Sequence, residues 1–489
     1  MKKITVLINL LFITFFINAQ EKVLDLNDTF YTSYLSKKES FAISNQVTND
    51  LVLLLKEKKK LYSYLLDVNY EILAKVTTKT LPSKYKNLLG YNIVDKKYTI
   101  LYSNDRNSKF AILQIDFTNN SSKIKILDDF KIKKELYIKS INYNNKVHIL
   151  AVTENTSDIN IYTFDEDFNS QKKVVTFENL EFPNLTGLDA KITASNIFAG
   201  IPLEYRIAKI ESSNPNVLET TSSQVKLYPL GNELVISFDI TPKETKLCYI
   251  NLDTFTTRHK TYAIQQKPEE DFSRSNSYLF DNKLFQIASS GIKLKFSILD
   301  LKTEELIKEY TIEEKDSITF KNSPIFIEGS DISLLFRKDK FRKVEKTKKF
   351  LKNVSSGSLG ISAYKVANEY NIVLGGIAFL SGGGAGGGFS AGGTIGSGGF
   401  ASLNFSPTSY GYRGYSTSSR TTYINCLFDT SFEHLQGDIP INKYDKLNDF
   451  EDTLPEEINA INIFMHNKIL HYNYFDPKER IFKVYQFKE

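Results

Sequence analysis

The sequence predicts an all-β repeat protein, and three observations support the prediction. Apolar and polar residues alternate with a period of two along most of the chain, which is the pattern of half-buried strands. Aromatic and β-branched residues are abundant, with 35 Phe and 28 Tyr, and segments with helical periodicity are few. One unit also recurs: an apolar run, a turn with an acidic residue, and a second strand-like run.

The spacing of these acidic residues predicts the architecture. Successive acids are separated by 49, 49, 46, 42, 47, 129 and 47 residues, and a period in the mid-forties is typical of a four-stranded β-propeller blade. We therefore predict a propeller of seven or eight blades over residues 20–489, since a closed ring leaves only short protected edges. The acids are Asp67, Asp116, Asp165, Glu211, Asp253, Asp300, Asp429 and Asp476, with Glu211 in the weakest copy.

A structural role explains the acid in each turn, because Asp and Asn hydrogen-bond their own backbone and favour hairpin turns. Residues 165–169, with sequence Asp-Glu-Asp-Phe-Asn, also resemble the start of a calcium loop. They lack the glycine at the sixth position and the closing glutamate of such a loop. The sequence therefore favours turns over metal sites.

The N-terminus has the features of a secretory signal peptide. Lys2 and Lys3 precede an apolar run that ends at Ile17, and Ala19 is a small residue at the expected cleavage site. The run is shorter than the roughly 20 residues that span a membrane, and no cysteine near the cut offers a lipid anchor. We expect residues 1–19 to be removed and the rest to be exported as a soluble protein with no membrane anchor of its own.

Charge and cysteine content give further limits. The formal charge of +5 over 489 residues is close to balanced, which does not indicate a nucleic-acid partner. Cys248 and Cys426 lie in strand-like runs far apart in the sequence. Buried free thiols are the favoured interpretation, and a disulfide is the alternative in an exported protein.

The 129-residue interval between Asp300 and Asp429 predicts an insertion in a late blade. The blade strands would be Ser317 to Ile327 and Asp331 to Arg337 before the insertion and Thr421 to Phe428 after it. The insertion would span residues 338–420. As an alternative, residues 358–376 alternate strongly enough to form a degenerate blade of their own.

The predicted insertion begins with a basic run of nine Lys and Arg residues from Arg337 to Lys352, against Asp339 and Glu345. Such a run is often a solvated face. It can also attract an acidic partner or anionic lipid head groups.

A Gly-rich apolar segment follows the basic run. Thirteen of the 25 residues from Gly375 to Gly399 are glycine, and no charged residue lies between Glu369 and Arg413. Glycine weakens ordinary strands and helices, and the apolar residues are unlike a hydrophilic linker. We predict partner contacts by apolar residues, by the Tyr/Gly/Arg cluster after them and by the basic run. The predicted contact residues are Ile377, Phe379, Leu380, Phe389, Ile395, Phe400, Tyr410, Tyr412, Arg413, Tyr415, Arg342 and Lys343.

Two interpretations of the Gly-rich segment remain open. It can be a flexible loop, or a loop that enters a cavity or pore of another protein. About 40 uncharged residues folded back on themselves could project roughly 65 Å, and they would bring no charge that must be desolvated. A phosphate-binding loop is disfavoured because no lysine follows the glycines and no helix former opens there.

The sequence has no motif for catalysis. None of the five histidines, His148, His259, His434, His466 and His471, lies in a metal-ligand pattern, and no nucleophile elbow occurs. We therefore predict no catalytic residue, cofactor or metal site. A propeller that binds or cleaves glycans through its central funnel is the alternative, although the absence of Trp weighs against sugar stacking.

The combination of signal peptide, propeller repeats and Gly-rich insertion resembles the periplasmic plug component of the flavobacterial type 9 secretion translocon. The resemblance covers the overall organisation and not a diagnostic motif. It implies a non-enzymatic periplasmic protein that docks on a large outer-membrane barrel complex and closes its periplasmic opening.

Overall fold

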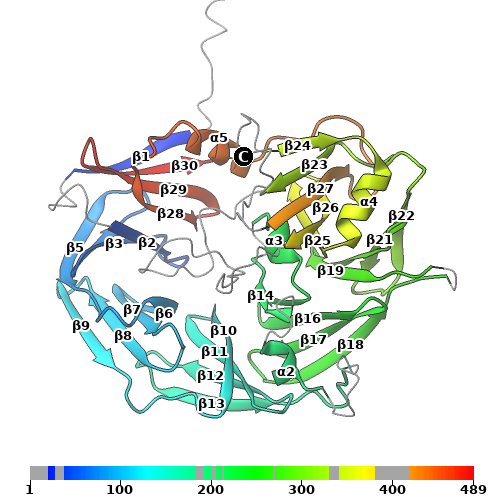
Figure 1. Ribbon diagram of the computed structural model, residues 1–489. Coiled ribbons are helices and arrows are strands. Elements are labelled where there is room, and N and C mark those ends of the chain that lie inside the picture. The colour runs from blue at the N-terminus through cyan, green and yellow to red at the C-terminus, as the bar shows by residue number, and fades with distance from the viewer. Residues whose placement is uncertain are drawn as a thin grey trace, which may run out of the picture. The chain divides into compact units, whose positions relative to one another are not determined.

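The computed structural model describes most of the chain after the predicted signal peptide. Its residues form seven sheets of four or five strands, which confirms the predicted all-β propeller fold (Figure 1). The chain divides into two compact units, one of residues 1–80 and 441–489 and the other of residues 81–440. The described residues are 20–27, 38–182, 192–199, 205–211, 214–267, 270–329, 341–379 and 419–488.

The smaller unit contains the first and the seventh sheet. The first has the strand order β2-β3-β4-β5 and the seventh the order β28-β29-β30-β1. Because β1 pairs with β30, from Gln20↔Phe487 to Leu26↔Phe482, the first and the last described strands share one sheet, in which β1 is the outer strand. The elements are β1 (Gln20–Leu26), β2 (Lys38–Ser44), β3 (Leu51–Glu57), β4 (Lys60–Leu66), β5 (Ile72–Lys79), α5 (Lys443–Glu451), β28 (Asn459–His466), β29 (Ile469–Asp476) and β30 (Ile481–Phe487).

The larger unit contains the second to the fifth sheet, with the orders β6-β7-β8-β9, β10-β11-β12-β13, β14-β15-β16-β17-β18 and β19-β20-β21-β22. The elements of the second and third sheets are β6 (Asn87–Val94), β7 (Lys97–Ser103), β8 (Phe110–Asp116), β9 (Ser121–Ile126), β10 (Glu135–Tyr143), β11 (Lys146–Thr153), β12 (Ile159–Phe164), β13 (Ser170–Val175) and α2 (Ala194–Phe198). Those of the fourth and fifth are β14 (Ala208–Lys209), α3 (Leu218–Thr221), β15 (Val225–Leu230), β16 (Glu233–Thr241), β17 (Glu244–Asn251), β18 (Thr257–Ala263), β19 (Arg274–Phe280), β20 (Lys283–Ser289), β21 (Lys293–Asp300) and β22 (Leu306–Glu313).

The sixth sheet also belongs to the larger unit, and its strand order differs from the chain order. Its five strands are arranged β24-β23-β27-β26-β25. The outer position beside β27 is taken by β23, which comes earlier in the chain. The elements are β23 (Ile325–Gly329), β24 (Phe341–Val344), α4 (Thr347–Ser355), β25 (Ser358–Val366), β26 (Glu369–Phe379) and β27 (Ser419–Phe428).

Burial follows the position of a strand in its sheet. The inner strand β3 is buried along nearly its whole length, whereas the outer strand β9 is exposed and carries Lys123 and Lys125. Lysines on an outer strand discourage pairing with another chain. Within the larger unit, one apolar core cluster joins the fourth, fifth and sixth sheets through residues such as Tyr228, Phe285 and Ile372.

Seven of the eight repeat acids end a strand or lie just after one, and each belongs to a different sheet. Most act as predicted for a turn: the Asp67 carboxylate accepts the backbone N–H groups of Asn69 and Glu71 at 2.9 and 2.8 Å. The Asp165 carboxylate likewise accepts the N–H groups of Asp167 and Asn169. In the fourth sheet the acceptor is Asn251, two residues before Asp253.

The copy at Glu211 is wrong as a blade. Its residues form the two-residue strand β14, which pairs in parallel with β15, and the short helix α3. Asp165 and Asp253 therefore mark neighbouring sheets 88 residues apart. Among its described residues, the segment between them adds the strand β14 to the fourth sheet and forms no further sheet, and its helix α2 contacts the third sheet.

The predicted bounds of the insertion also need correction. Residues 338–420 include β24, α4, β25 and β26, and these strands belong to the sixth sheet. The alternating segment 358–376 does form strands, but β25 pairs with β26 and β26 pairs with β27, so they belong to the sixth sheet and do not make a separate blade. Residues 331–337 lie outside the described residues. The connection that interrupts the sheet is thus residues 380–418.

Both cysteines are buried free thiols, as predicted. Cys248 lies in β17 and Cys426 in β27. Burial raises the pKa of each thiol, so both remain protonated at neutral pH and act as small apolar side chains.

Candidate functional site

The Gly-rich segment leaves and re-enters the fold through one long hairpin. Strands β26 and β27 pair antiparallel from Tyr370↔Phe428 to Phe379↔Ser419, and we call this pair the stem. Residues 380–418 connect the two strands. In the other sheets of the larger unit, the corresponding pairs of strands are β7 and β8, β11 and β12, β16 and β17, and β20 and β21. They are joined by residues 104–109, 154–158, 242–243 and 290–292.

Two glycines in the stem allow close packing on it. A Cβ atom on Gly375 would lie 2.8 Å from Leu218 Cδ1 of α3, and one on Gly376 would lie 2.8 Å from Val354 Cα of α4. Real Cβ atoms do not approach other atoms so closely, so both positions require glycine. The first two glycines of the Gly-rich segment are therefore packing residues within the sheet.

The helix α3 holds the stem by apolar burial and by one hydrogen bond. Leu218 packs with Val373, Ile377 and Tyr423 in one buried cluster. The Ser419 hydroxyl donates to Glu219 Oε1 at 2.7 Å, at the point where the chain returns to the sheet. Fully burying one large apolar side chain contributes about 1.5–3 kcal/mol, so this contact is a substantial part of what fixes the stem.

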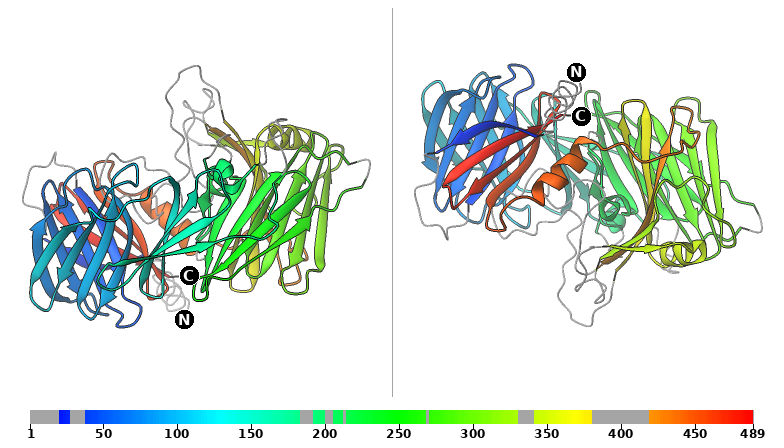
Figure 2. Two further views of the ribbon diagram at one scale, coloured as in Figure 1. Left: turned by 90° about the horizontal axis from the view of Figure 1, so that it is seen from below. Right: turned by 90° about the horizontal axis from the view of Figure 1, so that it is seen from above.

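The helix α4 also packs on the stem (Figure 2). Phe350, Leu351 and Val354 are fully buried, and their spacing of one, three and four residues places them on one helical face. The Asn353 side-chain amide donates to Thr422 Oγ1 of β27 at 3.2 Å. The opposite face of α4 is therefore left for solvent.

That solvent face and the strand before it are strongly basic. The exposed residues are Arg342 and Lys343 on β24, Lys346 before α4, and Lys348 and Lys352 on it. Together with the half-buried Lys349, we call these six residues the basic patch. Lys348 Nζ lies 3.2 Å from Glu314 Oε2, but its side chain is 72% exposed, so this pair contributes little to stability.

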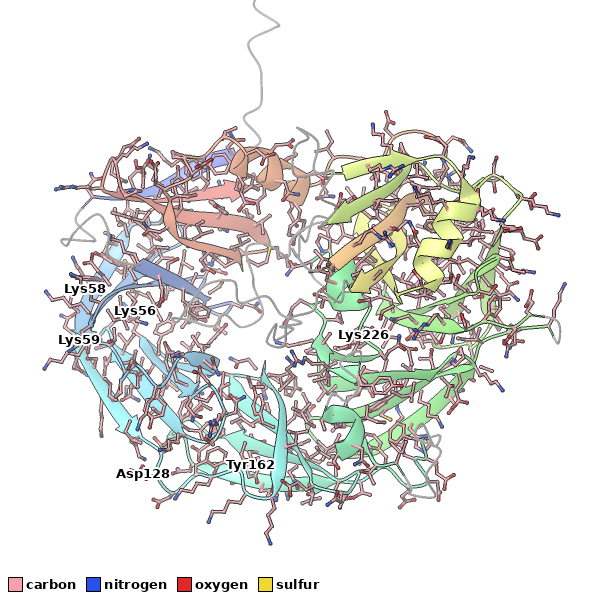
Figure 3. All side chains as sticks on the ribbon, viewed as in Figure 1. Lys56, Lys58, Lys59, Asp128, Tyr162 and Lys226 are labelled. Atoms are coloured by element: carbon pink, nitrogen blue, oxygen red, sulfur yellow. The ribbon has the colours of Figure 1, made fainter. Side chains whose placement is uncertain are left out.

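A buried ion pair lies next to the C-terminal end of α3 and helps to hold that end in place. Lys226 on β15 and Asp239 on β16 are inaccessible to solvent, and Lys226 Nζ lies 2.9 Å from Asp239 Oδ2. Figure 3 shows Lys226 within the fold, whereas Lys58 and Lys59 lie at an exposed turn. Burial lowers the pKa of Lys226, and the attraction to Asp239 opposes that shift.

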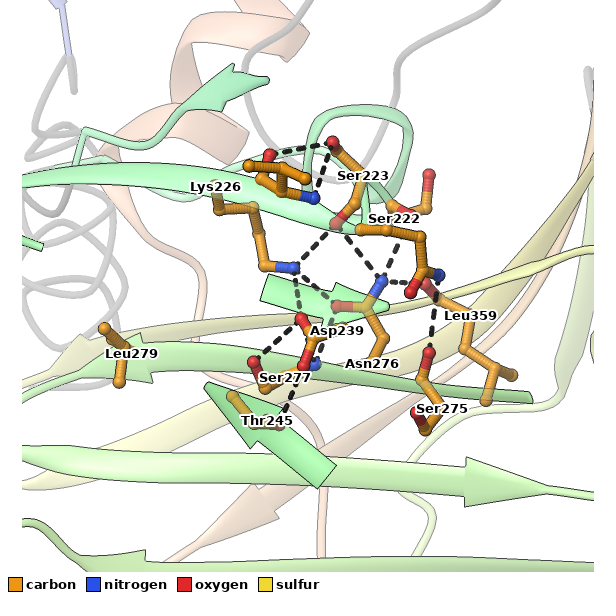
Figure 4. A network of polar contacts seen from close by, with 12 residues as sticks. Ser222, Ser223, Lys226, Asp239, Thr245, Ser275, Asn276, Ser277, Leu279 and Leu359 are labelled. Carbon is orange, nitrogen blue, oxygen red and sulfur yellow. Dashed lines mark hydrogen bonds and ion pairs between the residues drawn. The ribbon is translucent and has the colours of Figure 1, made fainter. Parts of the chain in front are cut away.

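Lys226 and Asp239 also form hydrogen bonds with the fourth and fifth sheets and with the residues that follow α3 (Figure 4). Lys226 Nζ donates to the Ser223 carbonyl at 2.6 Å and to Asn276 Oδ1 at 2.7 Å. Asp239 accepts from the hydroxyls of Thr245 and Ser277 at 2.7 and 2.9 Å. A buried pair with all its partners is retained, whereas an unpaired buried charge is costly.

Asn276 extends this network to the sixth sheet. Its amide donates to the Leu359 carbonyl of β25 at 2.7 Å and to the Ser222 carbonyl at the end of α3 at 3.1 Å. Ser222 and Ser223 directly follow α3. The network thus ties the end of that helix to the fourth, fifth and sixth sheets, and so helps to position the stem.

The structure gives different results for the residues that were predicted to contact a partner. Ile377 is fully buried in the cluster under α3, so its predicted role in partner contact is wrong, because its side chain has no free surface. Phe379 is the last residue of β26 and pairs with Ser419. Arg342 and Lys343 are exposed on β24. The other eight predicted contact residues lie outside the described part of the chain, and they are Leu380, Phe389, Ile395, Phe400, Tyr410, Tyr412, Arg413 and Tyr415.

Sequence reasoning missed the residues that support the stem. Leu218 and Glu219 lie in a segment interpreted as a weak repeat, and nothing local connects them to residue 375. Lys226 and Asp239 gave no signal either, because each stands between two apolar residues of its strand, at a position that period-two alternation assigns to the polar face.

The histidines His148, His466 and His471 are buried among other side chains of the fold. His471 Nδ1 lies 3.0 Å from the Ile469 carbonyl and its Nε2 lies 2.6 Å from the Tyr70 hydroxyl, so Nδ1 donates and Nε2 accepts. Burial lowers the pKa of His471 to about 4 and lowers that of its neighbour His466. His148 is similarly affected by burial, with a pKa of about 4. Within the described ranges, no three His, Cys, Asp or Glu residues are grouped as metal ligands would be.

No helix among the described residues has both the length and the apolar character needed to cross a membrane.

Comparisons with known proteins give no family. No protein-family model matches the sequence, and no curated protein matches it either. The WD40 domain of SCAP from fission yeast aligns with 92% of this chain and 84% of its own, at 9% identity and a TM-score of 0.32. A Synechocystis apocarotenoid oxygenase mutant, Trp149Ala, aligns with 57% of this chain and 61% of its own, at 8% identity and a TM-score of 0.28. This chain thus covers about three-fifths of that oxygenase, and TM-scores this low carry no argument about function.

Proposed function

We propose that this chain is a non-enzymatic, exported docking protein whose Gly-rich segment inserts into a cavity of another protein. Specifically, we propose the periplasmic plug of a type 9 secretion translocon, in which the cavity is the opening of a large outer-membrane barrel. The proposal places the protein in the periplasm, held at the outer membrane by its partner. It needs no cofactor.

The observation that carries the proposal is the support given to the stem. A connection that only joined two strands needs a few residues, as residues 242–243 show in the fourth sheet. Here the connection is residues 380–418, and its stem is packed by α3 and by α4. Elements that must present a binding segment are best built on a rigid scaffold.

The composition of the segment fits insertion into a protein cavity. Within the connection, residues 380–412 carry no charge, so a narrow opening could accept them without desolvating an ion. Irregular backbone at membrane depth is tolerated when protein encloses it or water fills the space around it. A large barrel offers such a place.

The test is to recover the protein with its partner. The tagged chain is purified from the detergent-solubilised envelope of the cells that make it, and companions are identified by mass spectrometry. In one variant Asn-Gly replaces residues 381–417, and in a matched control Asn-Gly replaces residues 104–109. We expect a large outer-membrane barrel with the wild type and the control, but not with the first variant.

Two results would contradict the proposal. One is recovery of the wild type only as a free monomer. The other is an unchanged yield of the same partner with the variant that lacks residues 381–417. Thermal unfolding of that variant must match the wild type, because the stem and its two helices are retained.

A further inference from the structure

The N-terminal end of the helix α4 has the charge pattern opposite to the one that stabilises such an end, although Lys352 in the last turn follows the rule. Its N-cap is Lys346, which provides no side-chain cap, and its first turn has no acidic residue. Lys348 and Lys349 lie in that first turn, where the helix dipole disfavours cations. Lys348 and Lys352 are four residues apart, a spacing at which like charges repel.

The seventh sheet shows that this chain can cap a helix of the same length. The nine-residue helix α5 has Asn442 as its N-cap, whose side chain accepts the N–H groups of Tyr444 and Asp445. The Asp445 carboxylate in turn accepts the Asn442 N–H at 3.0 Å. Local rules broken without a structural gain are expected at functional sites.

We propose that the basic patch binds an acidic surface on the protein that receives the Gly-rich segment. This inference rests on the proposed function and adds the chemistry of the partner. The patch holds six cations, with Glu345 as the acidic residue within it and Glu314 beside it. It adjoins the stem, because α4 packs on β26 and β27. An acidic rim around the receiving cavity would then guide the segment into place and hold it.

The structure favours a protein surface over a lipid surface. Helices that bind membranes combine cations with apolar side chains that enter the lipid. In α4 the large apolar side chains, Phe350, Leu351 and Val354, are all buried against the sheet. No large apolar side chain is exposed among the described residues 342–357. Attraction by charge alone suits a carboxylate-rich protein rim.

A variant that gives α4 a capping box like that of α5 separates the effect of the lysines on binding from their effect on stability. Lys346→Ser with Lys349→Glu creates an N-cap Ser and an acid three residues later, which is a capping box. This variant should be more stable than the wild type, because it obeys the helix-end rules. It should also bind an acidic surface less well. A structural role for the two lysines predicts the reverse for stability.

The measurement uses the full-length mature chain and a fluorescent poly-glutamate peptide as the probe, followed by anisotropy at low and at physiological salt. We expect salt-dependent binding that is about tenfold weaker in the Lys346→Ser/Lys349→Glu variant, since three units of positive charge are removed. A matched control, Lys123→Gln with Lys125→Glu, removes the same charge from the exposed strand β9 and should bind as the wild type does. Vesicles of phosphatidylcholine with phosphatidylglycerol form the second arm.

Three outcomes would overturn the inference. Equal loss of poly-glutamate binding in the control would mean that only net charge matters. Binding to the anionic vesicles with none to poly-glutamate would mean a lipid partner. Unchanged poly-glutamate binding in the Lys346→Ser/Lys349→Glu variant would exclude the patch. Because this assay does not need the Gly-rich segment, its failure leaves the co-purification test of the proposed function intact.

Discussion

The sixth and seventh sheets both depart from a simple run of consecutive strands, and they do so for different reasons. The seventh takes its outer strand, β1, from the other end of the chain, whereas the sixth takes β23 and β24 from before α4 and pairs β23 with β27. Each has a nine-residue helix, but α5 is fully capped and α4 is not. The seventh sheet is thus organised for closure and stability. The sixth is organised around a stem and an exposed set of charges.

The largest effect is expected from the ion pair that supports the stem. Lys226→Met leaves Asp239 buried without its cation, and breaking a buried pair in this way costs about 3–5 kcal/mol. Urea unfolding should show the loss as a lower midpoint. Lys58→Met, at an exposed turn, is the matched control and should change little. A loss below about 1 kcal/mol for Lys226→Met would mean that the network does not support the stem.

A smaller effect is expected from the stem glycines. Gly375→Ala places a Cβ 2.7 Å from Tyr423 Cβ and 2.8 Å from Leu218 Cδ1, and such overpacking costs about 1–3 kcal/mol. Gly291→Ala is the control, because its Cβ would meet only Ser355 Oγ at 4.0 Å. Thermal unfolding compares the two. Equal stability of both variants would show that the stem has room for a side chain at position 375.

The stability of the protein should fall in acid because of His471 in the seventh sheet. Its pKa of about 4 in the folded state lies below the roughly 6.5 of an unfolded histidine. The unfolded chain therefore binds more protons, so stability is fully present above pH of about 6.5 and falls as the pH drops towards 4, by up to about 1.4 kcal/mol per pH unit. His471→Gln should reduce this dependence in urea unfolding at pH 7 and 5, and the part that remains comes from the other buried histidines, such as His148.

Tyr70→Phe offers a comparison for that experiment. It removes the hydrogen bond to His471 Nε2, which costs about 1 kcal/mol, but leaves the burial that lowers the pKa. The pH dependence of Tyr70→Phe should therefore resemble that of the wild type. If His471→Gln also retains the full dependence, another group causes it.

The smallest effects are expected at the two helix ends, and they have opposite signs. Asn442→Ala removes the cap of α5 and should lower stability by about 1 kcal/mol. Lys346→Ser supplies a cap to α4 and should raise stability by up to about 1 kcal/mol. Both are read from thermal unfolding. A gain for Asn442→Ala or a loss for Lys346→Ser would remove the contrast between the two helices.

The sequence allowed the regular parts of the fold to be predicted because their signals are local. Asp67 and Asp165 accept backbone N–H groups two and four residues away, so the turn is encoded within a few residues. The same short-range logic predicted Cys248 and Cys426 as buried thiols in strands. It failed at Glu211, where similar residues form a helix and a short strand.

The stem shows why the remaining features could not be predicted. Gly375, Gly376 and Ile377 have the composition of the Gly-rich segment, yet they lie in β26 under α3 and α4. Their surroundings come from Leu218 and Val354, and Leu218 is more than 150 residues away in the sequence. No local pattern reports that contact.

The sequence by itself determined the all-β repeat, the acidic turns and the position of the Gly-rich segment in a late blade, because hydrophobic alternation and turn chemistry act over a few residues. Only the tertiary structure decided that β23 completes the sixth sheet, that Ile377 is core, and that Lys226 and Asp239 support α3. These outcomes depend on which distant segments pack together. That packing is set by non-local burial, which a pattern along one chain does not contain.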